Sequence, residues 1–212
     1  MDVRMFTVGP VAENSYVFRR EGSDRGLMVD PGDEPDKLLG AIDALGVTLD
    51  GILLTHTHFD HIGAVAPVAK ATGAEVWVPE KEAVVLADIN SFVPWPGFGP
   101  FESYEAEHTL EGGERLELAG FDIDVLFTPG HSSGHVTFSI PEEEAVFSGD
   151  VLFQGSVGRT DLPGGDWDTL LESLRTLVDT LPADTTVYPG HMGITSLGAE
   201  RATNPFLAEL AR

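Results

Sequence analysis

Residues 55–61 read Thr55-His56-Thr57-His58-Phe59-Asp60-His61 and follow the apolar run Gly51-Ile52-Leu53-Leu54. Imidazole nitrogen and carboxylate oxygen are ligands that zinc, manganese and iron accept. Alternate residues of an extended segment point to the same side, so His56 and His58 can bind one ion. Asp60 and His61 fall where the chain turns and can face a second ion. A polar loop whose histidines only satisfy backbone groups is the weaker interpretation, because four ligand-type residues stand within six positions.

Further ligand-type residues follow the ends of three other predicted strands. His131 comes after Phe127-Thr128-Pro129-Gly130, and His191 comes after Val187-Tyr188-Pro189-Gly190. Asp150 follows the apolar strand Ala145–Gly149, which glycine closes. Loops at strand ends commonly converge at one rim of a layered fold, and sites are built there. The sequence therefore predicts that these residues and the 55–61 stretch form one metal site.

The order of these residues resembles the full ligand set of the metallo-β-lactamase superfamily. The resemblance covers nearly the whole chain, from Asn14-Ser15-Tyr16 and Val29-Asp30-Pro31-Gly32 to Glu200-Arg201-Ala202-Thr203-Asn204-Pro205-Phe206-Leu207. Within the superfamily, residues 128–135 (Thr-Pro-Gly-His-Ser-Ser-Gly-His) and Gly158-Arg159-Thr160-Asp161 are similar to glyoxalase II-like hydrolases, also called hydroxyacylglutathione hydrolases. The short bacterial branch, which lacks the C-terminal helical domain, resembles this chain most.

The resemblance implies two divalent metal ions, with zinc expected first and iron or manganese also accepted by these ligands. The first ion would be bound by His56, His58 and His131, and the second by Asp60, His61 and His191. Asp150 would bridge the ions, because a carboxylate has two oxygens and a histidine offers one free nitrogen. Ions about 3.5–4 Å apart lower the pKa of a shared water toward 7. Asp60 would help to orient the resulting hydroxide.

The resemblance further implies a thioesterase that hydrolyses S-lactoylglutathione or a similar acyl thioester. Three alternatives stay open. A persulfide dioxygenase shares the fold but uses one iron held by two histidines and an aspartate. A lactonase or β-lactamase would use the same hydroxide on another carbonyl, although zinc β-lactamases with a cysteine ligand are excluded because the chain has no cysteine. A non-catalytic metal-binding or scaffold protein would be expected to have lost ligands, and this chain retains them all.

Length and composition favour a single globular domain over residues 1–212, because this length suits one sizeable domain and is short for two. The net charge of -23 argues against nucleic acid or an anionic membrane as a partner. We expect a cytoplasmic protein, since there is no cysteine, no signal peptide pattern and no apolar stretch of roughly 20 residues. The acidic surface would then serve solubility in a salty cytoplasm. A monomer or a homodimer is expected, with no sequence signal to choose between them.

Hydrophobic patterns predict strands alternating with helices in two similar halves. The expected strands are 3–7, 15–20, 25–30, 51–54, 75–78, 115–119, 121–127, 135–140, 145–148 and 186–188. The expected helices are 34–45, 62–71 and 79–87, a helix capped by Asp166 or Asp168 that runs through Leu181, and a helix over 199–211 that Pro205 breaks or restarts. Together with the resemblance, this pattern predicts an α/β (α+β) four-layered αββα sandwich.

Several residues outside the ligand set also require an interpretation. The aromatic, proline-rich residues 91–101 could close an apolar wall over a substrate or could pack as a surface loop. Residues 154–165 carry Arg159, which could contact substrate but is expected to pair with Asp161. Asp30 could accept a hydrogen bond from a metal-bound imidazole or could form a turn. Two histidines are not expected to bind metal, because the family's counterpart of His135 is structural or lies behind the ligands, and His108 lies in an acidic, solvated segment.

Overall fold

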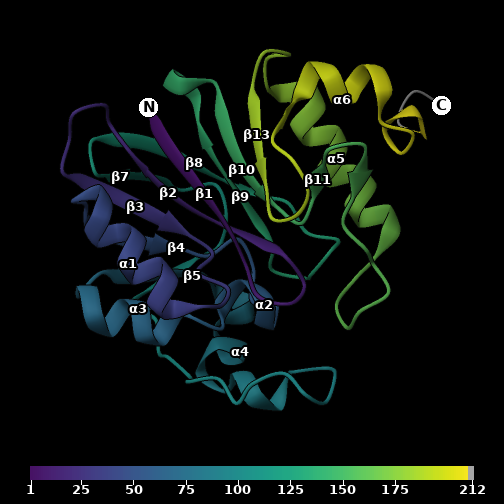
Figure 1. Cartoon of the computed structure of the whole chain (residues 1–212). Coiled ribbons are helices and arrows are strands. Elements are labelled where there is room, and N and C mark those ends of the chain that lie inside the picture. Colours follow the sequence, from purple (N-terminus) through teal and green to yellow (C-terminus); the bar gives the residue numbers. More distant parts are fainter. Residues whose placement is uncertain (210–212) are drawn as a thin grey trace. The chain divides into compact units, whose positions relative to one another are not determined.

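The computed structural model of the chain describes residues 1–209 (Figure 1). The end of the expected helix over 199–211 therefore lies partly outside the described residues. The chain forms two compact units. The first comprises residues 1–110 and 117–121, and the second comprises residues 111–116 and the chain from 122 onward. The expectation of one domain over residues 1–212 stays a prediction.

Among residues 1–209, the first unit contains a six-stranded sheet in the order β1-β2-β3-β4-β5-β6. β1, β2 and β3 are paired antiparallel, whereas β3, β4, β5 and β6 are paired parallel. The strands are β1 (Asp2–Val8), β2 (Glu13–Arg19), β3 (Arg25–Val29), β4 (Thr48–Leu53), β5 (Glu75–Pro79) and β6 (His108–Leu110). Val29 pairs with Leu53 at the ends of β3 and β4. The residues that follow these two strands therefore leave the sheet at the same edge.

The helices of the first unit are α1 (Pro35–Leu45), α2 (Phe59–Ile62), α3 (Val65–Thr72) and α4 (Ala83–Ala87), with 3₁₀ turns at Glu80–Glu82 and Ile89–Ser91. Figure 1 shows α1 and α3 side by side, and the two helices are in contact. The helix α1 ends at Gly46, whose φ of 61° lies in the left-handed region that glycine adopts readily. Fully buried residues such as Leu38, Ile52 and Val65 form the core between helices and sheet.

The second unit contains a sheet in the order β14-β13-β10-β9-β8-β7, six strands within the described residues. β8, β9 and β10 pair antiparallel, β10 pairs parallel with β13, and β13 pairs antiparallel with β14. The strands are β7 (Arg115–Leu118), β8 (Phe121–Phe127), β9 (Val136–Ile140), β10 (Ala145–Gly149), β13 (Thr186–Pro189) and β14 (Thr195–Ser196). Gly149 pairs with Pro189, and the N–H of Gly190 donates to the carbonyl of Gly149 at 2.8 Å. Asp150 and His191 therefore leave this sheet at the same edge.

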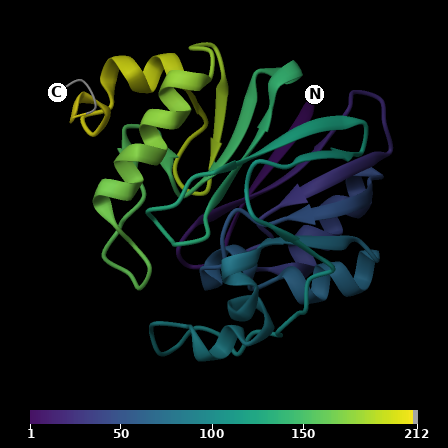
Figure 2. The same ribbon diagram turned by 180° about the vertical axis from the view of Figure 1, so that it is seen from behind.

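The helix α5 (Trp167–Thr180) covers the second sheet, and Figure 2 shows it alongside the strands. Leu170, Leu174 and Leu177 are fully buried in one cluster with Val146 and Val187 of the sheet. The helix begins at the Asp166 cap, whose carboxylate accepts from the N–H of Thr169 at 2.8 Å. The sequence left the cap open between Asp166 and Asp168, and the structure selects Asp166. The chain continues through α6 (Leu197–Thr203) and a 3₁₀ turn at Leu207–Glu209.

Two predicted helices differ from those observed. The predicted helix 62–71 is two helices, α2 and α3, which are separated at Gly63 and Ala64. A Cβ atom at Gly63 would lie 2.5 Å from the carbonyl oxygen of Gly32 and 2.8 Å from the ring of Phe101. At the break, the N–H of Ala64 donates to the carbonyl of Pro31 at 3.0 Å instead of continuing the helix. The predicted helix 79–87 opens as a 3₁₀ turn and becomes α-helical only at Ala83.

Some short elements were not predicted from the sequence. They are β6, β14 and the hairpin of β11 (Leu152–Phe153) with β12 (Ser156–Val157), for which no strand was predicted. Each has two or three residues, too few for a hydrophobic period, so pairing with a neighbouring strand defines it. The predicted helix over 199–211 begins earlier, at Leu197, and ends at Thr203. Among residues 1–209, no helix combines the length and the apolar character of a membrane span.

The α5 helix provides a test of the packing of the second unit. Leu174→Ala should lower the free energy of unfolding by about 3 kcal/mol, because it leaves a cavity in a fully buried cluster. Leu171→Ala on the same helix is the matched control, and since Leu171 is only partly buried it should cost about half as much or less. Urea unfolding at fixed metal concentration would measure both. Equal effects of the two substitutions would contradict the burial of Leu174.

Candidate metal centre

In the first unit, the predicted ligands lie on the loop that joins β4 to α2 and on α2 itself. His56 and His61 are fully buried, and the side chain of Asp60 is 16% exposed. The Nε2 atom of His61 lies 3.8 Å from Oδ2 of Asp60. The loop is short and follows a central parallel strand, so its side chains are held at the edge of the sheet where Asp30 also leaves it.

The buried carboxylate of Asp30 organises this loop. Its Oδ1 accepts from the N–H of Thr55 at 2.8 Å, and its Oδ2 accepts from the Thr55 hydroxyl at 2.6 Å and from Nδ1 of His61 at 3.0 Å. The Thr55 hydroxyl donates its one hydrogen bond to Asp30. It therefore accepts a hydrogen bond from Nδ1 of His56, 3.0 Å away. One carboxylate thereby places the protons of His56 and His61 on Nδ1. The Nε2 lone pairs of both rings are left for a metal ion.

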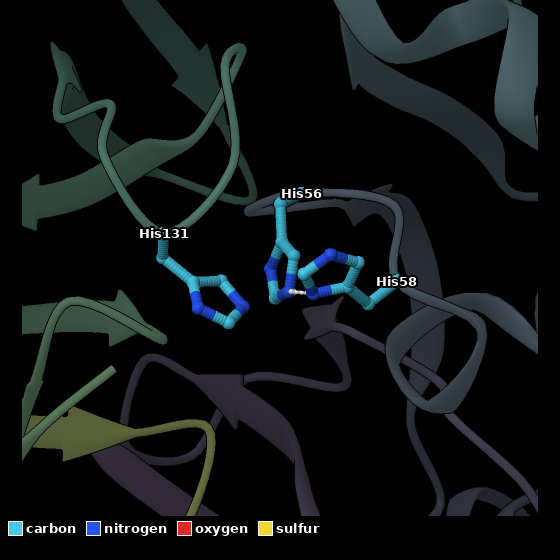
Figure 3. A group of neighbouring side chains, drawn as sticks. All are labelled: His56, His58 and His131. Carbon is cyan, nitrogen blue, oxygen red and sulfur yellow. Dashed lines mark hydrogen bonds between the residues drawn. The ribbon is translucent and has the colours of Figure 1, made fainter. Parts of the chain in front are cut away.

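The rings of His56 and His58 meet through the nitrogens expected to bind the first ion. Nε2 of His56 lies 3.1 Å from Nδ1 of His58, and the two rings are nearly perpendicular (Figure 3). Because Nε2 of His56 carries no proton, the proton of this contact is on Nδ1 of His58. A cation bound by both nitrogens would take the place of this proton, so the pair fits the role that the sequence predicts for it.

Two buried glutamates support this loop, and the sequence did not single them out. Glu82 Oε2 accepts from the N–H of Thr57 at 2.8 Å and from its hydroxyl at 3.0 Å, which fixes the residue between the first two histidines. Glu13 is fully buried, and its Oε1 lies 3.8 Å from Nδ1 of His61. Burial raises the pKa of the Glu13 carboxyl well above its usual value, and the nearby His61 opposes this rise. Their sequence signal is weak, because a glutamate in a helix or strand is usually exposed.

In the second unit, His131 lies on the loop that follows β8 (Figure 3). This loop is pinned to α5, because a Cβ atom at Gly130 would lie 2.3 Å from the backbone nitrogen of Leu170 and the Ser173 hydroxyl donates to the carbonyl of Pro129 at 2.6 Å. Nδ1 of His131 lies 2.7 Å from the carbonyl oxygen of Arg159. A carbonyl can only accept, so the His131 proton is on Nδ1 and its Nε2 can bind a metal.

Asp150 lies between two of the predicted ligands of the second unit. Its Oδ2 lies 3.4 Å from Nε2 of His131 and 3.5 Å from Nε2 of His191. The sequence assigned these two histidines to different ions and assigned Asp150 to both. The carboxylate thus lies between the two rings, and its bridging role stays a prediction.

His135 is held by other groups of the second unit. Its Nδ1 lies 3.0 Å from the hydroxyl of Thr128, and its Nε2 accepts from the N–H of Asp150 at 3.1 Å. Both ring nitrogens are therefore engaged within the protein. His135 thereby positions the backbone of Asp150, and its exclusion from the ligand set stays a prediction.

The segment of Arg159 acts on the site through its backbone. The carbonyl of Arg159 fixes His131, whereas its guanidinium forms two hydrogen bonds with the carboxylate of Asp161, at 2.6 and 2.7 Å. These hydrogen bonds lower the pKa of the exposed Asp161 carboxyl to about 2. The expected pairing of Arg159 with Asp161 is present, and contact of Arg159 with substrate stays a prediction.

A second supporting network lies behind the hairpin that follows Asp150. The buried carboxylate of Glu200 accepts from the N–H of Gly155 at 2.8 Å, from the Thr195 hydroxyl at 2.6 Å and from Nδ2 of Asn204 at 2.9 Å. Nδ2 of Asn204 also donates to the carbonyl of Ser156 at 3.0 Å. Residues 200–207 carry part of the family resemblance, and Glu200 and Asn204 within them hold the hairpin in place.

His108 and the segment 91–101 both lie in the first unit. His108 is only partly exposed, because its Nε2 lies 2.7 Å from Glu75 Oε2 and its ring stacks on Trp77 at 4.3 Å. It lies in β6, and its side chain is 41% exposed, in keeping with the expected solvated histidine. The segment 91–101 packs aromatic rings on Phe59, which lies between His58 and Asp60 in sequence.

Comparison with known proteins gives the family. The family model described as "Metallo-beta-lactamase superfamily" matches residues 8–191. The chain belongs to the metallo-β-lactamase superfamily. Over 98% of its length it is 41% identical to the probable metallo-hydrolase YqgX of Bacillus subtilis and 37% identical to the hydroxyacylglutathione hydrolase GloC of Haemophilus influenzae, and each match covers 98% of the relative.

Solved structures confirm the predicted fold class, the αββα sandwich of the metallo-β-lactamase type. The structure of BLEG-1, titled a B3 metallo-beta-lactamase, has a TM-score of 0.92 and 38% identity over 97% of this chain and 99% of that one. The di-iron-bound form of TTHA1623 has a TM-score of 0.79 and 42% identity over 96% of this chain and the whole of that one. The predicted membership of the superfamily is likewise confirmed.

The metallo-β-lactamase fold and the histidine and aspartate cluster imply metal ions. The donor atoms fit them, because Asp30, Thr55 and the Arg159 carbonyl leave the Nε2 atoms of His56, His61 and His131 unprotonated. Unprotonated imidazole nitrogens and carboxylates are what zinc and iron bind. The identity of the metal is a separate matter, since one neighbour is a di-iron protein.

Gly158 provides a test of the second half of this site. A Cβ atom there would lie 1.8 Å from the carbonyl oxygen of Asp150 and 3.1 Å from Nδ1 of His131. Gly158→Ala should therefore displace both residues, lower the free energy of unfolding by about 3 kcal/mol and reduce the metal that the purified protein retains. Gly40→Ala adds the same methyl group where no atom lies within 4 Å and is the control. Retention of metal and stability in Gly158→Ala would contradict the close packing.

Proposed function

We propose that this protein is a dinuclear metal-dependent hydrolase that acts on acyl thioesters, of which S-lactoylglutathione is the reference substrate. The observation that carries the thioester assignment is the full-length similarity to GloC, a hydroxyacylglutathione hydrolase. The dinuclear assignment rests on the ligand geometry of each unit. His56 and His58 form one pair, Asp60 and His61 form another, and Asp150 lies between His131 and His191.

In this proposal, His56, His58 and His131 bind one ion, Asp60, His61 and His191 bind the other, and Asp150 contacts both. When bound, two divalent ions supply an activated water at neutral pH and stabilise negative charge on the carbonyl oxygen of the substrate. Asp30 holds the imidazoles of His56 and His61 with their protons on Nδ1. The carbonyl of Arg159 does the same for His131. These contacts fix the ligands in advance, so that no reorganisation is needed when the substrate binds.

Asp60 is the proposed catalytic carboxylate, which would help to orient the attacking water. The thiolate leaves without a general acid, because a thiol has a pKa of about 8.5 and its anion is a good leaving group near neutral pH. No serine or cysteine nucleophile is required. We further propose zinc as the first metal to test, with iron and manganese as the alternatives, and a cytoplasmic protein that acts as a monomer or homodimer.

A β-lactamase activity is the second candidate, because BLEG-1 is titled a B3 metallo-beta-lactamase and resembles this chain over nearly its full length. The same water could attack a β-lactam or lactone carbonyl. A mononuclear iron persulfide dioxygenase is less well supported. It would need two histidines and one aspartate, whereas this chain also carries Asp60, His61 and His191.

A parallel assay panel separates these functions. Metal-loaded protein is expected to hydrolyse S-lactoylglutathione or a small acyl thioester with a kcat/KM at least about tenfold above that for any lactone or β-lactam tested. Oxygen uptake with glutathione persulfide should be at background. His191→Ala should abolish the thioesterase activity, and His108→Ala, outside the proposed site, should leave it unchanged. Faster turnover of a β-lactam, or oxygen uptake that needs only one iron, would overturn the proposal.

A further inference from the structure

The aromatic loop, residues 91–101, carries no charged side chain, although the chain has a net charge of -23. Phe92 is 49% exposed and Trp95 is 40% exposed, so the loop presents an apolar face to solvent. Exposed aromatic groups that gather beside a reactive centre mark a ligand-binding surface more often than isolated ones do. The composition of this loop differs from the acidic surface of the rest of the chain and requires an explanation.

The loop is held at both ends. The side chain of Asn90 donates to the carbonyl of Phe101 at 2.7 Å and accepts from its N–H at 2.9 Å, which closes the loop between these residues. The N–H of Tyr104 donates to the carbonyl of Leu86 at 3.0 Å and fixes the chain that follows. Val93, Phe98 and Phe101 pack against the core of the first unit. The apolar face is therefore presented by a supported loop.

The inner side of the loop packs on the metal-binding segment itself. The ring of Phe59 lies 4.8 Å from Phe98, 6.0 Å from Phe101 and 6.1 Å from Trp95, measured between ring centroids. Phe59 stands between two proposed ligands, His58 and Asp60, in the first turn of α2. Aromatic rings at these separations pack as offset or edge-to-face pairs. The loop and the ligands are thus connected through one buried ring.

We propose that the aromatic loop is the acyl-binding wall of the enzyme, in which Trp95 contacts the hydrocarbon chain of an acyl thioester and sets a preference for longer, uncharged acyl groups. This inference rests on the proposed thioesterase function and adds a substrate class to it. The loop carries no charged side chain and its exposed rings are apolar, which suits an uncharged hydrocarbon chain. Phe59 would support Trp95 from behind and act as a positioning residue.

The test uses acyl thioesters of one small uncharged thiol, N-acetylcysteamine, with straight acyl chains of two to eight carbons. A fully buried methylene contributes about 0.8 kcal/mol, or roughly a fourfold effect, and on a wall open on one side about twofold is expected. In the metal-loaded wild-type enzyme, kcat/KM should rise about twofold for each added methylene. Trp95→Ala should flatten this dependence, and Trp95→Phe should largely retain it. Met5→Ala, which removes another side chain of 40% exposure from β1, should not change it.

A binding measurement separates this inference from the proposed function. S-octyl N-acetylcysteamine, a thioether that cannot be hydrolysed, should change the tryptophan fluorescence of the metal-loaded enzyme, and the S-ethyl analogue should bind at least about tenfold more weakly. Trp95→Phe should bind the octyl compound but lose the fluorescence change. If no thioester is hydrolysed and the octyl compound still binds, the thioesterase proposal is wrong, but the proposal that the loop binds an apolar chain is retained. If Trp95→Ala and wild type show the same chain-length dependence, or if both thioethers bind equally well, the proposal that the aromatic loop binds the acyl chain is wrong.

Discussion

The carboxylate of Asp30 is the group on which the first half of the site depends. Its two oxygens accept three hydrogen bonds, two from Thr55 and one from His61, and through the Thr55 hydroxyl it also fixes His56. The side chain is 1% exposed, so these hydrogen bonds take the place of contacts with water. Removing one partner from such a buried network typically costs about 3–5 kcal/mol. The hydrogen bonds of Asp30 therefore serve two purposes. They stabilise the fold, and they determine which imidazole nitrogens can bind a metal.

Parallel strand pairing explains why ligands distant in sequence emerge at one edge of each sheet. Asp30 and the loop of His56 follow β3 and β4, which pair in parallel, and Asp150 and His191 follow β10 and β13, which do likewise. Each unit also holds its ligands by a backbone approach that admits no side chain, at Gly32 in the first and at Gly158 in the second. A Cβ atom at Gly32 would lie 1.7 Å from the carbonyl oxygen of Asp60. Glycine at these two positions is therefore a steric requirement of the ligand loops.

The sequence predicted the ligand-bearing strand ends well, because a buried strand followed by His or Asp is an unusual local pattern. The strands β3, β5, β8 and β10 were placed to within about one residue, because each is a short apolar or alternating run bounded by turn residues. The supporting carboxylates Glu13, Glu82 and Glu200 were not found, since their role depends on burial by partners far away in sequence. The break between α2 and α3 was also missed, because there the N–H of Ala64 bonds to the carbonyl of Pro31, which lies more than thirty residues earlier in the chain. Local pattern thus predicted the candidate ligands, whereas tertiary contacts determine what holds them.

The central claim is that the chain binds two metal ions through one shared carboxylate. Elemental analysis of protein purified under metal-replete conditions tests it most directly, with Asp150→Ala and His191→Ala prepared in parallel. The account predicts close to two ions per chain in the wild type, about one in His191→Ala and a loss from both sites in Asp150→Ala. A firm ceiling of one ion in the wild type, or an Asp150→Ala protein that still holds two, would contradict it.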